Sequence, residues 1–557
     1  MTSTFSAKER TAILKEMSEK PLDLLVIGGG ITGAGIALDA QVRGIQTGLL
    51  EMRDFAEGTS SRSTKLVHGG LRYLKQFEVK LVAEVGRERA IVYENAPHVT
   101  TPVWMLLPIY KQGTFGKFTT SIGLKIYDFL AGVKKEERRT MLSREQTLEK
   151  EPLLKKEGLL GGGYYVEYRT DDARLTLEVM KEAVRRGVKA VNHAKAVELL
   201  YDENGKIQGV RAVDQITGES YRIYAKKVVN ATGPWVDTIR EMDHSKKGKY
   251  LHLTKGVHIV IDGKRFPLKN AVYFDTPNGD GRMVFAIPRA GKVYIGTTDT
   301  NYDGDITRLK MTEADRDYLL EAANGMFPSL NLTPADIESS WAGVRPLIHE
   351  EGKDPSEISR KDEIFVSESN LISIAGGKLT GYRQMAKKTV DLVAKQLEQE
   401  TGQTYPACST DKVKLSGGDV GGGDGYPRFV QEKTREGVGL GLDEAEAEKL
   451  VRLYGSNVDR VFDIIKSSAE EAGNAGLPKS IYAQIVYGID EEMTVKPVDF
   501  FIRRTGALLF DMEWVKKWQE PVVRVMQNHL GWSDEQTEAY KSELQQAIDD
   551  AVHPDKG

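Results

Sequence analysis

The sequence predicts an α/β protein, in which a doubly wound parallel-sheet domain carries an inserted antiparallel α+β cap and precedes a C-terminal all-α domain. Three observations support this prediction. Residues 22–51 read as strand, glycine turn, helix and strand, which is the βαβ unit of a parallel sheet. Residues 255–347 contain short apolar β-runs, and residues 426–557 are charged with helical periodicity. The expected divisions are residues 1–254 with 348–400 for the parallel-sheet domain, 255–347 for the cap, 401–425 for a linker and 426–557 for the helical domain.

The composition is that of an ordinary globular protein. The chain has 557 residues, and its 77 basic and 81 acidic residues nearly cancel, so nothing global predicts a nucleic-acid partner. A single cysteine, Cys408, excludes an internal disulfide and a Cys-x-x-Cys redox pair. No apolar run approaches the length of a membrane-spanning helix, and we expect no metal centre.

The first βαβ unit carries a glycine pattern with a physical purpose. The apolar run Asp23 to Ile27 leads into Gly28, Gly30 and Gly33, and a later strand ends at Glu51. The glycines allow a tight turn, a close approach of backbone to a pyrophosphate, and close packing of helix on strand. The helix N-terminus offers unpaired N–H groups to the phosphates, and the acid is placed to accept hydrogen bonds from a ribose. The unit therefore predicts a dinucleotide site.

Further elements follow in order along the chain. Pro97 ends a helix at 78–95, and Asn204-Gly205 marks a hairpin because both residues tolerate a positive φ. The other expected elements are a helix at 172–187, strands at 196–202, 207–214, 226–231, 257–261, 283–287, 292–296 and 371–375, and a helix to about 399. The glycine-rich segment 417–425 follows no strand, so it reads as a linker rather than a phosphate loop.

Two later strands also end in glycine. One runs through Val228 and Val229 into Ala231, Thr232 and Gly233, and the other ends at Gly376 and Gly377 before a helix. Small residues at a strand end let a cofactor approach the backbone, and a helix N-terminus can face its charged parts. Each junction alone is a weak signal, but together they suggest that distant segments return to one nucleotide.

At these positions the chain resembles the FAD-dependent glycerol-3-phosphate dehydrogenases. Two motifs of that family are complete: Ile27-Gly28-Gly29-Gly30-x-x-Gly33-Ala34-Gly35-x-Ala37-x-Asp39-x-x-x-Arg43-Gly44 and Gly376-Gly377-Lys378-x-x-Gly381-Tyr382-Arg383-x-x-Ala386. The segments 63–73, 255–258, 296–299, 343–347 and 503–505 are also similar to those of the family. The resemblance covers nearly the whole chain and is far more specific than the glycine pattern.

The resemblance implies an FAD enzyme that oxidises glycerol 3-phosphate. A hydride would pass from carbon 2 to the flavin, a proton would leave the adjoining hydroxyl, and the electrons would pass to a quinone. Such a site needs cations for a phosphate dianion, a base for the hydroxyl and a donor to the developing carbonyl oxygen. The matching motif positions supply all three residue types.

Two arginines are the predicted phosphate clamp. Arg72 and Arg345 each present a planar guanidinium that grips a phosphate bidentately, and Tyr73 adds a hydroxyl. The alternative for each arginine is an ordinary surface ion pair. The apolar surroundings in Val-Arg-Pro-Leu disfavour that alternative for Arg345, because an unpaired charge there is costly.

The predicted catalytic residues are His258, Lys378 and Arg345. His258 lies in an apolar strand, where a neutral imidazole accepts the hydroxyl proton, although a hydrogen-bonded core histidine fits the pattern equally well. Lys378 opens the last strand–helix junction, where a cation stabilises the reduced flavin or holds substrate oxygens; its alternative is a solvated lysine. Thr297 or Thr298 lines the substrate pocket, or else forms a structural turn.

The predicted cofactor ligands come from the glycine turns and from a serine-rich loop. That loop either hydrogen-bonds the ribityl and pyrophosphate portions of the flavin nucleotide or is a loop without a ligand. The full set is Gly28, Gly30, Thr32, Gly33, Glu51, Thr59, Ser60, Ser61, Ser63, Lys65, His68, Gly69, Ala231, Thr232, Gly233, Gly376, Gly377, Lys378, Leu379 and Thr380.

The leading functional hypothesis is therefore a quinone-linked, FAD-dependent glycerol-3-phosphate dehydrogenase. A glycerol-3-phosphate oxidase that reduces oxygen and a flavin-binding scaffold without turnover are the alternatives. A nicotinamide reductase is disfavoured, because the chain has one complete nucleotide fingerprint. The oligomeric state, including a homo-oligomer, is left open.

A quinone acceptor implies work at a membrane surface. We expect a cytoplasmic protein that attaches peripherally to the inner face of the membrane through residues 101–133, where apolar and aromatic residues alternate with lysines. Trp104, Leu106, Leu107, Phe115, Phe118 and Phe129 would enter the interface, and Lys111, Lys117, Lys125, Lys134, Lys135, Arg138 and Arg139 would meet anionic lipid. The alternative is that this stretch packs in the core or lines the cap.

Overall fold

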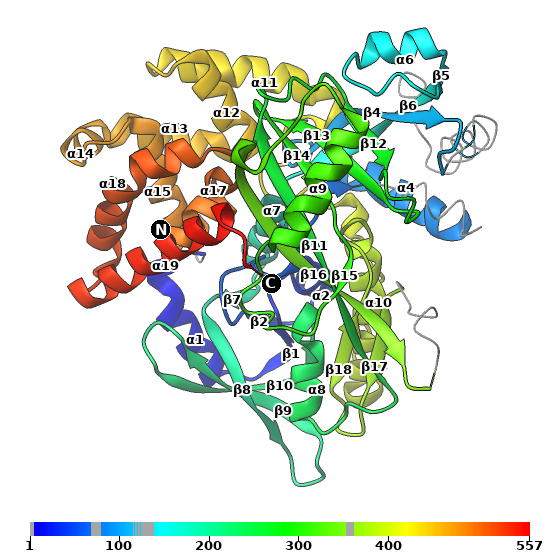
Figure 1. The fold of residues 1–557 in the computed structure, drawn as a ribbon. Coiled ribbons are helices and arrows are strands. Elements are labelled where there is room, and N and C mark those ends of the chain that lie inside the picture. The colour runs from blue at the N-terminus through cyan, green and yellow to red at the C-terminus, as the bar shows by residue number, and fades with distance from the viewer. Residues whose placement is uncertain are drawn as a thin grey trace.

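A parallel sheet at the base of the molecule is the first structural unit (Figure 1). The computed structural model describes residues 5–67, 79–114, 116, 120, 123, 139–352 and 361–556. The strands run in the order β17 (Glu363–Val366), β18 (Ile372–Ala375), β10 (Ser220–Asn230), β1 (Leu22–Ile27), β2 (Thr47–Leu50) and β7 (Lys189–Val191). All neighbours pair in parallel except β17 with β18. Strand β1 is central and apolar because a parallel sheet is covered on both faces.

The predicted elements of this unit are present. The hairpin of β8 (Ala194–Tyr201) and β9 (Ile207–Asp214) extends from β10, and Gly205 in its turn has a φ of +71°. The helices of the N-terminal part are α1 (Arg10–Glu19), α2 (Ile31–Val42), α4 (Val79–Asn95), α6 (Arg144–Lys150), α7 (Asp172–Arg185), α8 (Val236–Met242), α9 (Glu313–Met326) and α10 (Tyr382–Thr401). Helix α2 packs between α7 and α10. The α/β architecture that the sequence predicts is confirmed.

A second sheet, mostly antiparallel, lies above the first in Figure 1. It contains β3 (Leu66–Val67), β4 (Thr100–Tyr110), β5 (Thr140–Leu142), β6 (Leu159–Thr170), β11 (Lys249–Asp262), β12 (Ala271–Asp275), β13 (Met283–Arg289), β14 (Lys292–Gly296), β15 (Thr300–Asn301) and β16 (Ile337–Glu350). The sheet is larger than the predicted segment 255–347, because strands β3 to β6 join it from earlier in the chain. Strand β11 also begins six residues before that segment.

The C-terminal part is helical, as predicted, but it shares a core with the second sheet. Its helices are α11 (Gly422–Gly439), α12 (Glu444–Tyr454), α13 (Val458–Ser467), α14 (Ala469–Asn474), α15 (Lys479–Glu491), α16 (Pro497–Asp499), α17 (Ala507–Phe510), α18 (Met512–Leu530) and α19 (Asp534–Val552). One apolar cluster joins Val260 and Trp341 of the sheet to Phe500 and Leu508 of the helices. Another lies on the other face, between the sheet and α9. The sheet is thus covered on both faces.

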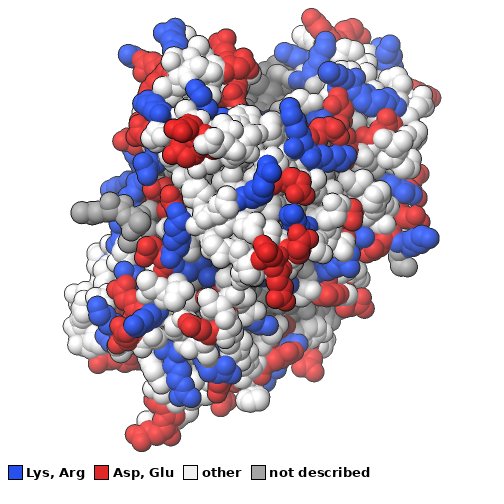
Figure 2. All heavy atoms as spheres, turned by 90° about the vertical axis from the view of Figure 1, so that its left-hand side faces the viewer, with Lys and Arg blue, Asp and Glu red and all other residues white. Residues whose placement is uncertain are grey.

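The surface of the C-terminal side has no large patch of a single charge sign. Figure 2 shows this side, where lysine and arginine are interspersed with aspartate and glutamate. This agrees with a net charge of −4 over the chain. None of the described helices is long and apolar enough to cross a membrane.

The apolar stretch 101–133 is only partly as predicted. Its first ten residues belong to β4, where Leu106 and Leu107 are buried, so the prediction that these two side chains enter a membrane is wrong. Trp104 stacks on Tyr164 of the neighbouring strand. Phe115, Lys117, Phe118, Lys125, Phe129, Lys134, Lys135 and Arg138 lie outside the described residues.

The glycine-rich segment 417–425 is packed rather than extended. Helix α11 begins inside it, at Gly422. A Cβ on Gly418 would lie 2.1 Å from the carbonyl oxygen of Asn95, so this glycine lets two backbones meet. The segment therefore fastens the C-terminal helices to the end of α4.

Candidate functional site

The cofactor edge is built from the carboxyl ends of parallel strands. Because β1, β2, β10 and β18 run in the same direction, Gly28, Glu51, Ala231 and Gly376 follow strands that end at one edge. A Cβ on Gly28 would lie 2.4 Å from the carbonyl oxygen of Ala231, and its φ is +113°. A Cβ on Gly33 would lie 1.9 Å from the carbonyl oxygen of Gly28. Only glycine fits these two positions, as the fingerprint predicts.

Two long helices point their N-termini at this edge. Helix α2 follows Gly30 and α10 follows Gly381, and neither N-cap residue caps its helix with a side chain. Thr32 lies in the first turn of α2, whereas Lys378, Leu379 and Thr380 form the turn before α10. Such helix ends attract the negative charge of a pyrophosphate.

The other two predicted glycine turns have the backbone that they need. Gly233 has a φ of +56°, and Gly376 and Gly377 have φ values of +77° and +81°. The side-chain oxygen of Asn230 accepts hydrogen bonds from the backbone N–H and the hydroxyl of Thr232, which fixes the turn after β10. These turns leave backbone, rather than side chains, facing the edge.

Glu51 is bound to the glycine turn itself. Its Oε2 accepts a hydrogen bond of 2.7 Å from the N–H of Gly29, and its Oε1 accepts one of 2.8 Å from the N–H of Arg53. Burial raises the pKa of Glu51 to about 7, even though these two hydrogen bonds lower it. Each carboxylate oxygen keeps a lone pair for a ribose hydroxyl.

A raised pKa makes the stability of the protein without a bound cofactor depend on pH. The unfolded chain ionises Glu51 near pH 4.5 and the folded chain near 7, so folding loses stability as pH rises between these values. We expect the loss attributable to Glu51 to be at most about 3 kcal/mol. Glu51→Gln should remove this component of the pH dependence. Urea unfolding of both proteins at about pH 5 and about pH 8 measures the free energy of unfolding at each pH. If this free energy changes equally with pH in the parent and in the variant, Glu51 does not titrate in this range.

The serine-rich loop joins the two sheets. Ser60 Oγ accepts a hydrogen bond from the N–H of Ile31 at the start of α2, and Thr59 Oγ1 donates to the carbonyl of Val344 in β16. Ser63 and Lys65 both bind Asp172, and the Lys65 Nζ lies 2.6 Å from its Oδ1. The loop therefore holds the second sheet against the cofactor edge.

The donors at this edge fit a cofactor. Among the described residues, Ser61 has a buried hydroxyl oxygen with no hydrogen-bond partner, and it follows Ser60, which binds the start of α2. Buried polar atoms are nearly always paired. An unpaired hydroxyl, two helix ends with glycine at the N-cap and three glycine turns together fit a nucleotide.

His258 lies where the second sheet meets the serine-rich loop. Its Nε2 is 3.0 Å from Thr64 Oγ1, and its ring stacks on Trp341 at 4.6 Å between centroids. Its Nδ1 has no partner among the described residues. A Cβ on Gly296 would lie 2.0 Å from the His258 ring, so this glycine makes room for it. Burial and the charges of Arg345 and Lys65 hold the pKa of His258 well below its usual value, so the imidazole is neutral at pH 7.

Arg345 lies on the same face of the sheet as His258. In the pairing of β11 with β16, His258 is opposite Trp341 and Thr254 is opposite Arg345, so all four side chains share a face. The guanidinium donates to Asp299 at 3.0 Å and to Thr297 Oγ1 at 3.3 Å. The ion pair that the sequence disfavoured is thus present, but the Arg345 side chain remains 34% exposed. The hydroxyl of Thr298, by contrast, is buried and accepts from the Val257 N–H.

Four predicted site residues lie outside the described residues: His68 and Gly69, which are predicted cofactor ligands, and Arg72 and Tyr73, which are predicted substrate ligands. The structure adds two residues that the sequence did not single out. Trp341 supports the His258 ring, and the hydroxyl of Thr254 is buried beside Arg345 with no partner among the described residues. Strand alternation from His258 would have pointed to Thr254.

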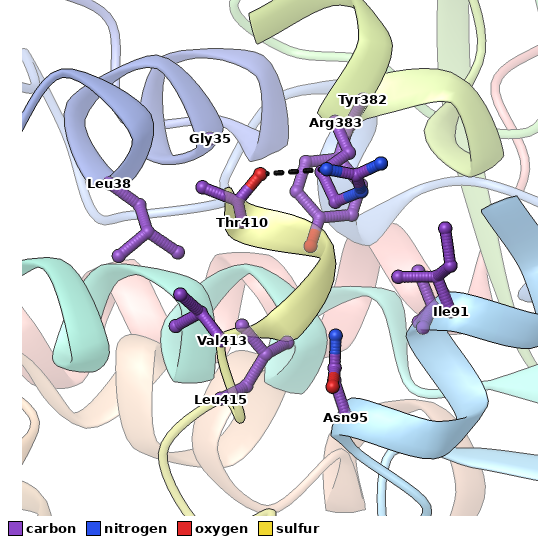
Figure 3. Close-up of a pocket in the computed structure, with 10 residues that line it drawn as sticks. Gly35, Leu38, Ile91, Asn95, Tyr382, Arg383, Thr410, Val413 and Leu415 are labelled. Carbon is purple, nitrogen blue, oxygen red and sulfur yellow. Dashed lines mark hydrogen bonds between the residues drawn. The ribbon is translucent and has the colours of Figure 1, made fainter. Parts of the chain in front are cut away.

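A small pocket lies apart from the predicted cofactor ligands. Figure 3 shows it between α2, α4 and α10, where Arg383 donates a hydrogen bond of 2.9 Å to Thr410. Arg383 is also paired with Glu88 at 2.9 Å. None of the residues that line this pocket is a predicted cofactor or substrate ligand.

The fold and its glycine-lined edge define the class of protein. A family model described as FAD dependent oxidoreductase matches residues 23–385, and a model of the C-terminal domain of alpha-glycerophosphate oxidase matches residues 408–537. The chain is thus an FAD-dependent oxidoreductase.

Closer relatives identify the particular family. The aerobic glycerol-3-phosphate dehydrogenase of Bacillus subtilis is 61% identical, over 100% of this chain and 99% of the relative. That of Staphylococcus aureus (strain USA300) is 58% identical, over 99% and 98%. A solved structure of the glycerol-3-phosphate dehydrogenase from Bacillus halodurans, complexed with FAD, is 56% identical with a TM-score of 0.86 over 99% of both chains. The chain belongs to the aerobic glycerol-3-phosphate dehydrogenase family, and its cofactor is FAD.

Proposed function

We propose that this protein oxidises sn-glycerol 3-phosphate to dihydroxyacetone phosphate and passes the electrons through FAD to a quinone. One observation carries the proposal. A buried neutral histidine and a partly exposed arginine share one face of the second sheet, and the serine-rich loop holds that face against the cofactor edge. Family membership supports the same substrate.

In this arrangement, different residues would act on the phosphate and on the carbon-2 hydroxyl of the substrate. Arg345 would bind the phosphate, since its guanidinium is oriented by Asp299 and Thr297 and its side chain is 34% exposed. His258 would take the proton of the carbon-2 hydroxyl on its unpartnered Nδ1, while Thr64 and Trp341 fix the ring. When bound, FAD supplies the hydride acceptor. Arg72, Tyr73 and Lys378 complete the substrate site in this proposal.

The cofactor-holding residues are proposed from the same geometry. The glycine turns at 28–33, 231–233 and 376–377 would border the nucleotide, with the helix N-termini facing its phosphates. Glu51 would accept from the ribose, and Ser61 would use its unpaired hydroxyl. Thr59, Ser60, Ser63 and Lys65 already bind protein groups, so we propose that they act mainly by shaping the loop.

The electron acceptor is tested by a direct comparison. Holoenzyme with sn-glycerol 3-phosphate should form dihydroxyacetone phosphate rapidly when a soluble quinone analogue is added. With oxygen as the only acceptor, product and hydrogen peroxide should form far more slowly. Stoichiometric peroxide at an undiminished rate would identify an oxidase instead, and no product with either acceptor would favour a flavin-binding scaffold.

A quinone acceptor carries a proposal about location. Because long-chain quinones dissolve in lipid, the enzyme would work in the cytoplasm at the inner surface of the membrane, bound peripherally. The lysines around residues 111–139 remain the proposed contact with anionic headgroups. Leu106 and Leu107 are excluded from that contact because they are buried in β4.

A further inference from the structure

The loop from Glu51 to Ser61 shapes the glycine turn of the cofactor edge. Three contacts join them: the Gly29 N–H donates to Glu51, the Ala56 N–H donates to the Gly29 carbonyl at 3.0 Å, and the Ile31 N–H donates to Ser60. The side chain of Phe55 also lies against Gly29, where a Cβ would meet it at 2.7 Å. If this loop moves, the geometry of the glycine turn changes with it.

The other side of the same loop is held by the C-terminal helices. Asp54 accepts hydrogen bonds of 2.8 Å from both terminal nitrogens of Arg504 and one of 2.5 Å from Nε of Arg503. These three side chains are at most 3% exposed. Asn192 donates to the remaining lone pair at 3.0 Å. The pairing joins residues 450 positions apart in the sequence.

Other buried groups hold Arg503 and Arg504 in place. They end the π-helical turn Phe500–Arg504, a rare conformation that often marks functional segments. Arg503 donates to Asp499 at 2.6 Å, and Arg504 donates to the Glu492 carbonyl at 2.9 Å. Arg174 of α7 donates to the carbonyl of Arg504 at 2.8 Å. The guanidinium pair is therefore a rigid fork.

Stability alone does not account for such a cluster. Taking charged groups out of water costs about as much as their attraction returns, and apolar residues of similar volume often serve stability better. A buried hydrogen-bonded network, such as the one in which all four acceptor positions of the Asp54 carboxylate are used, instead fixes one geometry. Here the geometry that it fixes is that of the loop against the glycine turn.

We propose that the C-terminal helical domain positions the FAD-binding loop, with Arg503 and Arg504 as the positioning residues and Asp54 as their anchor in the loop. Arg503 also lies 3.7 Å from Glu57 of the same loop. The proposal concerns FAD binding independently of the substrate. Loosening the fork frees the loop and the glycine turn, so FAD is held less tightly.

Arg504→Lys tests the proposal against a matched control. Lysine keeps the positive charge but cannot make the two parallel hydrogen bonds that Arg504 makes to the Asp54 carboxylate. The control is Arg43→Lys, since Arg43 is equally buried on Asp39 but lies at the far end of α2, about 18 Å from the glycine turn. The readouts are the Kd of FAD, from flavin fluorescence on dilution of the holoenzyme, and the Tm of each protein.

We expect Arg504→Lys to weaken FAD binding at least about tenfold, while Arg43→Lys lowers Tm similarly but changes the Kd by less than about twofold. The proposal is overturned if Arg504→Lys leaves the Kd unchanged, or if both variants weaken FAD equally. Should Arg504→Lys fail to fold, Arg503→Lys decides, since Arg504 still holds Asp54. A Kd raised by about threefold or more supports the proposal, and an unchanged Kd overturns it.

Discussion

His258→Gln is expected to slow flavin reduction by sn-glycerol 3-phosphate about 10²- to 10⁴-fold, the range that a positioned general base contributes. Glutamine retains polarity and approximate size but cannot take up the proton. The His258 ring is stacked on Trp341 and held at Nε2 by Thr64, so the geometry for proton transfer is fixed before the substrate binds. Stopped-flow mixing without oxygen measures the rate.

The pH profile gives this prediction a second, independent readout. A base must be neutral to work, and burial together with Arg345 and Lys65 keeps the pKa of His258 well below 6.5. The parent rate should therefore stay constant as pH falls from 8 through 6.5 and decline only below that, as the imidazole takes up a proton. A substrate phosphate on Arg345 offsets part of the positive charge that lowers this pKa.

The variant should lack this acid-side decline. Its FAD content and Tm serve as controls, because a core histidine without a catalytic role would change Tm and leave the profile intact. If His258→Gln is reduced at the parent rate with the parent profile, another group is the base, and Lys378 becomes the next candidate.

Arg345→Ala is expected to lower the catalytic efficiency for sn-glycerol 3-phosphate by about 10- to 100-fold, because loss of a charged hydrogen bond costs about 1.5–3 kcal/mol. The efficiency for unphosphorylated glycerol should change little, since a clamp acts on the remote phosphate. Steady-state kinetics on both substrates measure the difference.

Asp299→Asn separates the clamp from the ion pair. This variant removes the charge that Arg345 faces at 3.0 Å but keeps the guanidinium and a hydrogen-bond acceptor. We expect it to keep most of the efficiency for the phosphorylated substrate. Equal losses on both substrates in Arg345→Ala, together with an equally impaired Asp299→Asn, would make the ion pair structural.

The sequence predicted those parts of the molecule that local physics determines. Gly28 and Gly33 are required by backbone contacts within one βαβ unit, so their pattern is visible in the chain. The helices at 79–95 and 172–185 and the hairpin at Gly205 follow from periodicity and turn chemistry in the same way. The placement of Arg345 and Lys378 depended on family motifs as well.

The features that the sequence did not reveal depend on contacts between distant segments. Nothing in residues 100–110 shows that they pair with β6 and β12, so the sequence alone allows both a lipid-facing surface and a buried strand. Asp54 looks like an ordinary loop acid until Arg503 and Arg504 are brought to it. The glycines at 417 and 418 look like a linker until Asn95 and His98 are found against them.

For His258, the sequence pattern and the structural contacts are both needed to assign a role. The apolar strand around it allowed either a core histidine or a base. Its ring is buried, as a core residue would be, yet Nδ1 lacks a partner among the described residues and Arg345 lies on the same face. A buried, neutral imidazole that accepts a proton from the substrate is the interpretation that fits both observations.

The central claim, that this site oxidises a phosphorylated polyol with FAD, is tested most directly by anaerobic titration of the holoenzyme. The visible absorbance of the oxidised flavin is followed as sn-glycerol 3-phosphate is added. Glycerol and sn-glycerol 1-phosphate, the enantiomer of the substrate, are the controls. The account predicts full bleaching by sn-glycerol 3-phosphate at one equivalent of product per flavin and almost none with either control. A flavin that stays oxidised in the presence of excess sn-glycerol 3-phosphate would contradict it.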